Sequence, residues 1–290
     1  MTAESSLPAA ARIGRVALRV RNLERVSRFY ETVIGLDVRE RRDDRAVLAA
    51  GEEPLVVLVE DPKAAPRGAD ETGLFHTAFL VPSRAALGDA LERIEDRWQL
   101  DGSADHVVSE ALYLSDPEGN GVEVYCDRPR EEWPVADDGT IGIGTEPLDL
   151  EGVRSAGQGR ESTPDATTVG HVHLEVSSLP AAREFYVDAL GMGIKQRFDD
   201  SALFVAADGY HHHLGLNVWG SRSVPPRGRG LEWFELLVPD AGALAALRER
   251  LEQRGSDTAD EADGDGFETT DPDGIRLRIR ESDLERPIPV

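Results

Sequence analysis

The strongest constraint on the fold of this 290-residue chain is an internal repeat. An offset of 156 residues separates Val20 from Val176 and Gly35 from Gly191. At both places the pattern predicts an alternating strand, then a helix that ends at the glycine, then short strands. A duplicated unit explains this match better than chance.

A second unit of similar order follows each copy. These units open with strands at 75–81 and 232–238, and each contains an Asp-Pro-x-Gly turn, at 116–119 and 271–274. The chain is therefore predicted to be α+β, with four βαβββ modules. The expected divisions are an N-terminal tail (1–12), a first domain with modules one and two (13–128), a connector (129–168), a second domain with modules three and four (169–281) and a C-terminal tail (282–290).

The composition excludes several classes of partner. The formal net charge is -23, from 55 acidic and 32 basic residues, and this balance argues against nucleic acid or an anionic membrane. It also suits a high-salt cytoplasm. Cys126 is the only cysteine, which fits a reducing compartment. Residues 1–12 lack the features of a signal peptide, and no apolar run approaches the roughly 18 residues of a membrane helix. We expect a cytoplasmic protein.

The opening strands of modules two and three carry histidine at the same position. When the four modules are aligned on the last valine of the opening strand, His76 and His171 stand five residues before it, and Glu123 follows the turn of module two. Two imidazoles and a carboxylate suit Fe(II) or Mn(II) with open coordination positions. For an isolated Glu123, a solvent-facing strand residue would be the ordinary interpretation. The matching positions in modules one and four are Arg15, Trp233 and Arg278.

A longer run around Glu123 resembles the signature of extradiol ring-cleavage dioxygenases, and the modules resemble the vicinal oxygen chelate superfamily. The likeness to the Bacillus-type catechol 2,3-dioxygenase group covers most of the chain, including 109–127, 169–185 and 209–217. Ala104 departs from the signature, two positions before its histidine. The residues that carry the signature are His106-Val107-Val108-Ser109, Leu112-Tyr113, Asp116-Pro117-Glu118-Gly119 and Glu123.

The resemblance implies a fold of two open, barrel-like cups and a metal held by His76, His171 and Glu123. Fe(II) is the expected metal, with Mn(II) as the alternative. Because the three ligands come from modules two and three, these modules should pair across the connector in one metal cup. Modules one and four would then pair as a cup without metal. Pairing within each half would separate His171 from the other two ligands.

By the same resemblance, one of three consecutive histidines is the acid–base group. His213 is the first choice and His212 the second, because histidine can hold or release a proton near neutral pH. His211 is expected to contact the substrate. The alternative is a loop that enters a strand with exposed imidazoles, and neighbouring strand residues alternate in direction.

Four more residues are candidates for the substrate site. His106 and Tyr113 resemble the residues that hydrogen-bond the substrate oxygens or position its ring, although Tyr113 could equally be an ordinary buried aromatic. His173 shares a strand face with His171 and could line the cup or orient a ligand. Trp219 could line the substrate mouth, and core packing is an equal alternative for it.

The implied function is extradiol cleavage of catechol or a substituted catechol, with Fe(II) and O2, to a muconic semialdehyde. The partners are then a small aromatic diol and O2, and a homo-oligomer remains open. A glyoxalase-type isomerase or lyase is one alternative, but it should carry a second metal carboxylate on the closing strand of module three, near 211–216. A small-molecule-binding protein of the same fold, without catalysis, would not need the three ligands.

Overall fold

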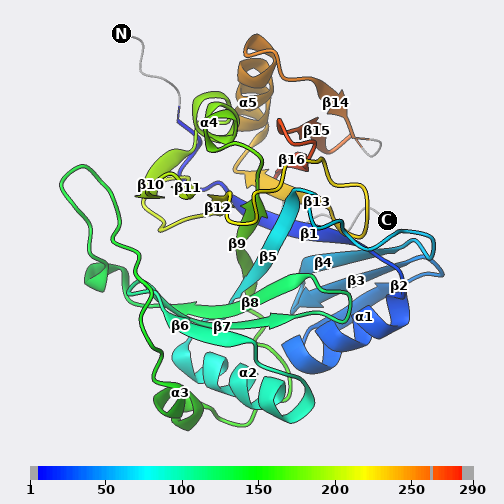
Figure 1. Ribbon diagram of the computed structural model, residues 1–290, viewed down its shortest axis with the longest axis vertical. Coiled ribbons are helices and arrows are strands. Elements are labelled where there is room, and N and C mark those ends of the chain that lie inside the picture. The colour runs from blue at the N-terminus through cyan, green and yellow to red at the C-terminus, as the bar shows by residue number, and fades with distance from the viewer. Residues whose placement is uncertain (1–5, 262–263, 283–290) are drawn as a thin grey trace.

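The computed structural model describes residues 6–261 and 264–282. Of the predicted tails, residues 1–5 and 283–290 lie outside this description. Two curled eight-stranded sheets make up the molecule (Figure 1), which confirms the predicted α+β class with βαβββ modules. Each sheet contains one module from each half of the chain.

Modules two and three form the sheet that we call the metal-cup sheet. β5 and β9 meet at its centre as antiparallel neighbours and run side by side in Figure 1. The pairing across the connector that the ligand positions required is therefore present. In order across the sheet, the strands are β10 (Gly193–Phe198), β11 (Ala202–Ala206), β12 (Leu214–Asn217), β9 (Thr168–Glu175), β5 (Gly73–Leu80), β8 (Gly121–Asp127), β7 (Ser109–Ser115) and β6 (Gly102–Asp105).

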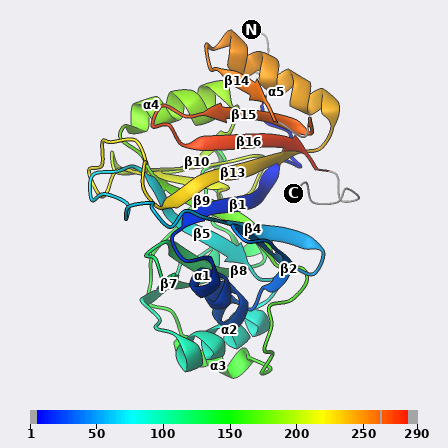
Figure 2. The same ribbon diagram turned by 90° about the vertical axis from the view of Figure 1, so that its right-hand side faces the viewer.

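Modules one and four form the second sheet, with β1 and β13 as its antiparallel centre (Figure 2). The two sheets pack together where β1 contacts β9 and β13 contacts β5. The predicted domain limits, 13–128 and 169–281, divide the sequence into two halves, whereas each sheet combines one module from each half. In order, the strands are β14 (Thr258–Asp260), β15 (Gly266–Thr270), β16 (Arg276–Glu281), β13 (Gly230–Val238), β1 (Arg12–Val20), β4 (Glu53–Glu60), β3 (Arg45–Ala50) and β2 (Asp37–Arg41).

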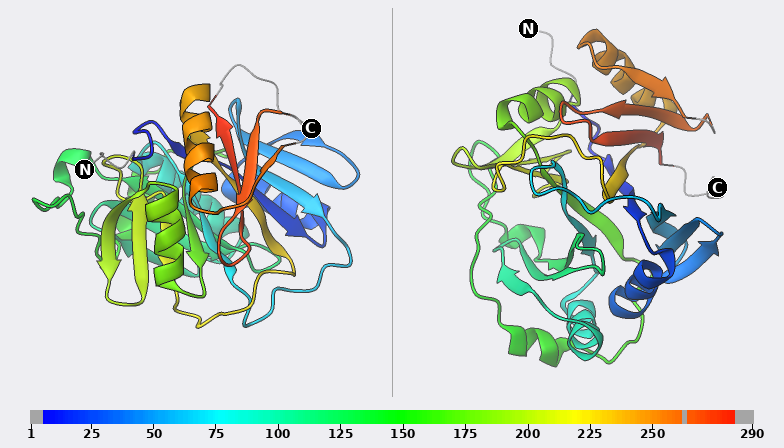
Figure 3. Two further views of the ribbon diagram at one scale, coloured as in Figure 1. Left: turned by 90° about the horizontal axis from the view of Figure 1, so that it is seen from above. Right: turned by 45° about the vertical axis from the view of Figure 1, so that its right-hand side comes forward.

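Each module helix begins at a polar capping residue directly after its opening strand. The side chains of Asn22, Ser83, Ser178 and Asp240 accept hydrogen bonds from backbone N–H groups of the first helical turn. No helix in the described part of the chain is long and apolar enough to cross a membrane. The helices are α1 (Leu23–Phe29), α2 (Arg84–Arg97), α4 (Leu179–Arg183) and α5 (Ala241–Gln253), and the last two lie over their own strands in Figure 3.

The helices of the repeated unit change character in their second half. α1 continues as the π-helix η1 (Tyr30–Ile34), and α4 continues as η3 (Glu184–Ala189). A glycine with positive φ ends the turn in both copies: Gly35 (88°) directly follows η1, and Gly191 (86°) follows η3 after Leu190. The sequence predicted one uniform helix in each copy, and the shared π segment shows that the wider turn belongs to the duplicated unit.

The connector contains the short helices η2 (Arg130–Glu132) and α3 (Leu150–Ala156). Its middle part is packed against the metal-cup sheet, because Trp133, Ile141 and Ile143 are buried in one cluster with Phe204 and Tyr210. The connector therefore supplies part of the wall of the cup.

Candidate metal centre

The three predicted ligands lie on three neighbouring strands of the metal-cup sheet. Ala78 on β5 pairs with both His171 on β9 and Glu123 on β8. His76 stands two residues before Ala78, on the same face of the strand. The register of the three strands thus brings together side chains that are far apart in the chain.

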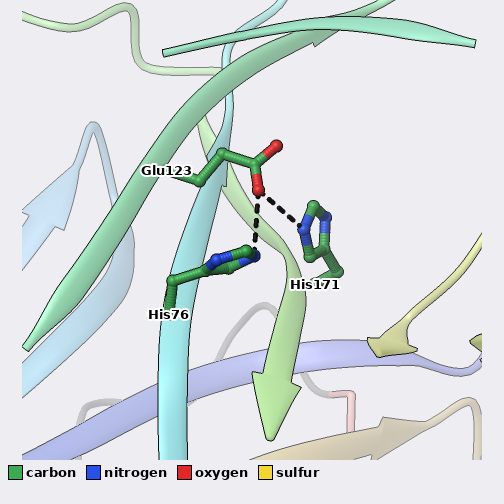
Figure 4. A group of neighbouring side chains, drawn as sticks. All are labelled: His76, Glu123 and His171. Carbon is green, nitrogen blue, oxygen red and sulfur yellow. Dashed lines mark hydrogen bonds and ion pairs between the residues drawn. The ribbon is translucent and has the colours of Figure 1, made fainter. Parts of the chain in front are cut away.

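The ligand atoms converge on one point (Figure 4). Glu123 Oε2 lies 2.9 Å from His76 Nε2 and 3.2 Å from His171 Nε2. The three side chains are buried, and their ligand atoms lie within 4.8 Å of one another. His76 Nε2 makes no hydrogen bond of acceptable geometry despite its short distance from the carboxylate. This arrangement suits a shared cation better than a hydrogen-bonded pair.

The electrostatics of the centre also suit a metal. Burial lowers the pKa of His171 to about 4, which keeps its imidazole neutral. Burial alone would raise the pKa of Glu123, but the imidazoles of His171 and His76 outweigh it and hold this pKa well below its usual range. A neutral imidazole and an ionised carboxylate are the forms that bind metal ions.

His106 and Tyr113 form a hydrogen-bonded pair beside the ligands. The Nδ1–H of His106 donates to the carbonyl oxygen of Gly144, 2.7 Å away, so His106 Nε2 accepts from the Tyr113 hydroxyl at 2.5 Å. Burial raises the pKa of Tyr113 well above its usual value and keeps the hydroxyl protonated. Val107, next to His106, has a φ of 72°, an uncommon conformation for a β-branched residue that fixes this turn.

A cavity of about 570 Å³ opens in front of the three ligands. Phe75, Phe198, Phe204 and Trp219 supply aromatic rings to its wall. Trp219 is half exposed, so it stands at the mouth. The combination of apolar walls and a few convergent polar groups is typical of a small-molecule site.

His173 reaches into this cavity because β12 leaves space for it. Gly215 pairs with His173, and a Cβ at Gly215 would lie 1.7 Å from the imidazole. Both ring nitrogens of His173 are buried without a hydrogen-bond partner. Burial also lowers its pKa well below the usual value, so the ring offers one donor and one acceptor to a ligand.

The structure separates the three consecutive histidines. His212 lines the cavity, with its ring centroid 4.1 Å from that of His171. His211 does not line it; this fully buried residue contacts Asp127 and His212. His213 lines a different cavity of about 250 Å³ near the N-terminal segment, and its Nδ1 accepts from the N–H of Ala207. Of the two histidines that we predicted for acid–base chemistry, His213 first and His212 second, His212 lies in the cavity with the predicted ligands and His213 does not.

Eight of the ten predicted site residues line one cavity. His211 and His213 do not, because the three histidines precede β12 and its alternation does not govern their directions. Sequence reasoning missed the aromatic wall of Phe75, Phe198 and Phe204. Phe75 could have been noticed because it directly precedes His76, whereas the others carried no signal. The residues brought together are His76, His106, Tyr113, Glu123, His171, His173, His212 and Trp219.

The paired modules and the cavity in front of three candidate ligands agree with a family match over both halves of the chain. The chain belongs to the Glyoxalase/Bleomycin resistance protein/Dioxygenase superfamily, whose family model matches residues 12–124 and 168–279. The resemblance to the vicinal oxygen chelate proteins is thereby confirmed.

Among relatives, the chain is 43% identical over 251 residues to the catechol-2,3-dioxygenase of Bacillus subtilis (strain 168), across 84% of this chain and 88% of the relative. The fold is shared with a solved Bacillus subtilis protein (TM-score 0.65, 16% identity, 96% of this chain and 86% of the other). It is also shared with glyoxalase I of Zea mays (TM-score 0.58, 17% identity, 94% and 92%).

Proposed function

We propose that this protein is an extradiol dioxygenase that opens the ring of a catechol with Fe(II) and O2 to give a muconic semialdehyde. The observation that carries the proposal is the set of His76, Glu123 and His171 at the inner end of an aromatic-walled cavity. The relative named catechol-2,3-dioxygenase supports the same activity. The acidic composition and the lone cysteine support a cytoplasmic location.

Fe(II) fits the donors present, with Mn(II) as the alternative. His76, His171 and Glu123 would hold it, and when bound it would supply open coordination positions for both substrate oxygens and for O2, and a path for electron transfer between them. The protein's own share is to bind the ring, exclude water and manage protons.

Two groups manage protons in this proposal. The Tyr113 hydroxyl donates to His106, so its oxygen lone pairs are available to accept from a substrate hydroxyl. His212 lies on the other side, beside His171, and has a buried Nε2 without a hydrogen-bond partner. This nitrogen can accept the proton that a catechol loses and return it later.

The cavity favours a substituted catechol over catechol itself. Benzene fills an apolar cavity of about 150 Å³, whereas this one measures about 570 Å³. Phe75 and Trp219 lie edge to face, with centroids 5.4 Å apart, at the outer side of the cavity. We therefore propose that an apolar substituent packs against these rings.

The first experiment is anaerobic reconstitution with Fe(II), followed by catechol or 3- and 4-alkyl catechols and air. A yellow ring-opened product with stoichiometric O2 uptake is expected, with a higher kcat/KM for the substituted substrates. His76→Ala and Glu123→Ala should lose the activity. His213→Asn is the matched control, because His213 lies outside the cavity, and it should stay active. Bound metal without O2 uptake on any catechol would refute the proposal.

The glyoxalase-type alternative has less support. The closing strand of module three, β12, carries no carboxylate, and the described metal-ligand group contains only one.

A further inference from the structure

Asp127, His211 and His212 form a hydrogen-bonded chain that ends at the cavity. Asp127 is the last residue of β8, four residues after Glu123. Its Oδ1 lies 2.9 Å from His211 Nε2, and His211 Nδ1 lies 2.7 Å from His212 Nδ1. Both histidines are buried.

The donors and acceptors in this chain follow from its first member. An ionised carboxylate only accepts hydrogen bonds, so His211 Nε2 carries a hydrogen and donates it to Asp127 Oδ1. When this is the only hydrogen on the two ring nitrogens, His211 Nδ1 is a lone-pair acceptor. Because two facing nitrogens need one hydrogen between them, His212 Nδ1 carries it. His212 Nε2 is left with a free lone pair.

The far end of the chain reaches the wall of the cavity. His212 Nε2 has no hydrogen-bond partner. The ring of His212 is packed between those of His171 and Phe204, with centroid distances of 4.1 Å and 4.9 Å. The ring therefore has little freedom to turn over, and its hydrogen-bond chain favours one nitrogen as the site of the hydrogen.

Aromatic rings also hold His211 in place. The centroids of Tyr210 and Trp133 lie 4.2 Å and 5.1 Å from its own. Tyr210 also donates a long hydrogen bond of 3.4 Å to Asp127 Oδ1. Such packing keeps the His211 ring in place, so the hydrogen bond to Asp127 at one ring nitrogen determines whether the other nitrogen donates or accepts.

We propose that Asp127 and His211 are positioning residues that fix His212 in the tautomer with Nδ1–H and a free Nε2 lone pair. The catalytic consequence rests on the proposed function: the O–H bond of a substrate hydroxyl breaks, a bond forms between that proton and His212 Nε2, and the ring becomes an imidazolium. The tautomer itself does not depend on any reaction.

The direct test is nuclear magnetic resonance of the 15N-labelled full-length protein loaded with diamagnetic Zn(II). Long-range 1H–15N correlations distinguish a protonated from an unprotonated ring nitrogen, and a His212→Gln variant assigns the signals. We expect His212 with a protonated Nδ1 and an unprotonated Nε2. A protonated Nε2 on His212 would overturn the proposal.

Two variants of Asp127 distinguish the effect of its hydrogen bond to His211 from an effect on folding. Asp127→Asn keeps an acceptor oxygen and should keep the tautomer. Asp127→Leu removes the acceptor and should give a mixture or the reverse tautomer, with an unchanged backbone amide spectrum. Any other pattern in the two variants overturns the assignment.

Kinetics then test the catalytic consequence. In Asp127→Leu we expect kcat to fall roughly ten- to hundredfold, with a small change in KM and full metal content, and Asp127→Asn should rescue most of kcat. A rise in KM or a loss of metal instead would indicate a merely structural role and overturn the positioning role. Absence of turnover in the wild type would count against the proposed function and leave the tautomer measurement standing.

Discussion

At the scale of single residues, the small side chain of Ala78 leaves space for the three proposed metal ligands. It is fully buried and pairs with both His171 and Glu123. A larger side chain here would project toward the point on which the ligand atoms converge. Ala17 on β1 is its counterpart in the second sheet, where it pairs with Trp233.

We predict that Ala78→Val lowers metal affinity at least tenfold, because the added methyl groups push the ligands apart. Overpacking should cost about 1–3 kcal/mol of stability. Ala17→Val carries a similar packing cost and should leave metal binding unchanged. Isothermal titration calorimetry with Mn(II) and urea unfolding measure the two effects, and equal metal affinities in the two variants would contradict the prediction.

A second prediction at this scale concerns His213 and the pH dependence of the free energy of unfolding. Burial lowers its pKa from 6.5 to about 3 in the folded chain. The stability that the neutral ring contributes is therefore present above pH 6.5 and is lost as the pH falls toward 3, because the unfolded chain binds the proton first. His213→Asn removes this dependence. Relative to the variant, the wild type should lose about 2 kcal/mol between pH 7.5 and pH 5.

Urea unfolding at both pH values checks this expectation. Parallel losses in the wild type and in His213→Asn would show that His213 is not held neutral by the fold.

At the scale of elements, the second sheet repeats the geometry of the cup with different chemistry. Its positions that match His76 and Glu123 are Trp233 and Arg278, and the guanidinium of Arg278 lies 4.1 Å from the centroid of the Trp233 ring. Arg15, which matches His171, pairs with the buried Glu235. A fixed cation of the chain thus stands where the other sheet carries the proposed metal ligands.

We predict that Arg278→Ala destabilises the protein by about 1 kcal/mol through loss of the cation–π contact, while one metal per chain is still bound. Chemical unfolding and metal analysis give the two numbers. A double-mutant cycle with Trp233→Leu isolates the contact from the ion pair of Arg278 with Glu268, and a coupling energy near zero would count against it.

The elements differ in how well the sequence predicts them. The opening strands predicted at 75–81 and 232–238 lie within two residues of the observed limits of β5 and β13, because apolar runs mark buried strands. The outer strands β2, β6, β10 and β14 carry mixed polar side chains and gave no such signal. The directions of His211, His212 and His213 could not be predicted either, since they depend on packing against Tyr210 and His171.

At the scale of the whole molecule, neither half of the chain contains a complete cup. His76 and Glu123 come from the first half and His171 from the second, and β5 and β9 join them. This pairing was predictable because the requirement for three ligands at one point is stronger than the preference for neighbouring modules to pair. The connector's part in the wall was not predictable, since it depends on how Trp133 and Ile143 pack.

We predict that residues 1–160 and 161–290, produced separately, each bind metal weakly because each lacks at least one ligand and leaves two central strands unpaired. Mixed in equal amounts, they should recover one bound metal per pair. Metal analysis after gel filtration measures the stoichiometry. Tight metal binding by either fragment alone would contradict the pairing across the connector.

The order of the sheets also sets an order of assembly during synthesis. Module three is the next module after the connector, so β9 can join β5 while about a hundred residues up to the end of β16 remain to be made, roughly 5–20 s of translation at about 5–20 residues per second. β1 is among the first strands made, yet its partner β13 is in the last module. The metal-cup sheet can therefore be complete on the ribosome while an edge of β1 stays open. We expect the nascent chain to be able to load its metal before its own synthesis has ended.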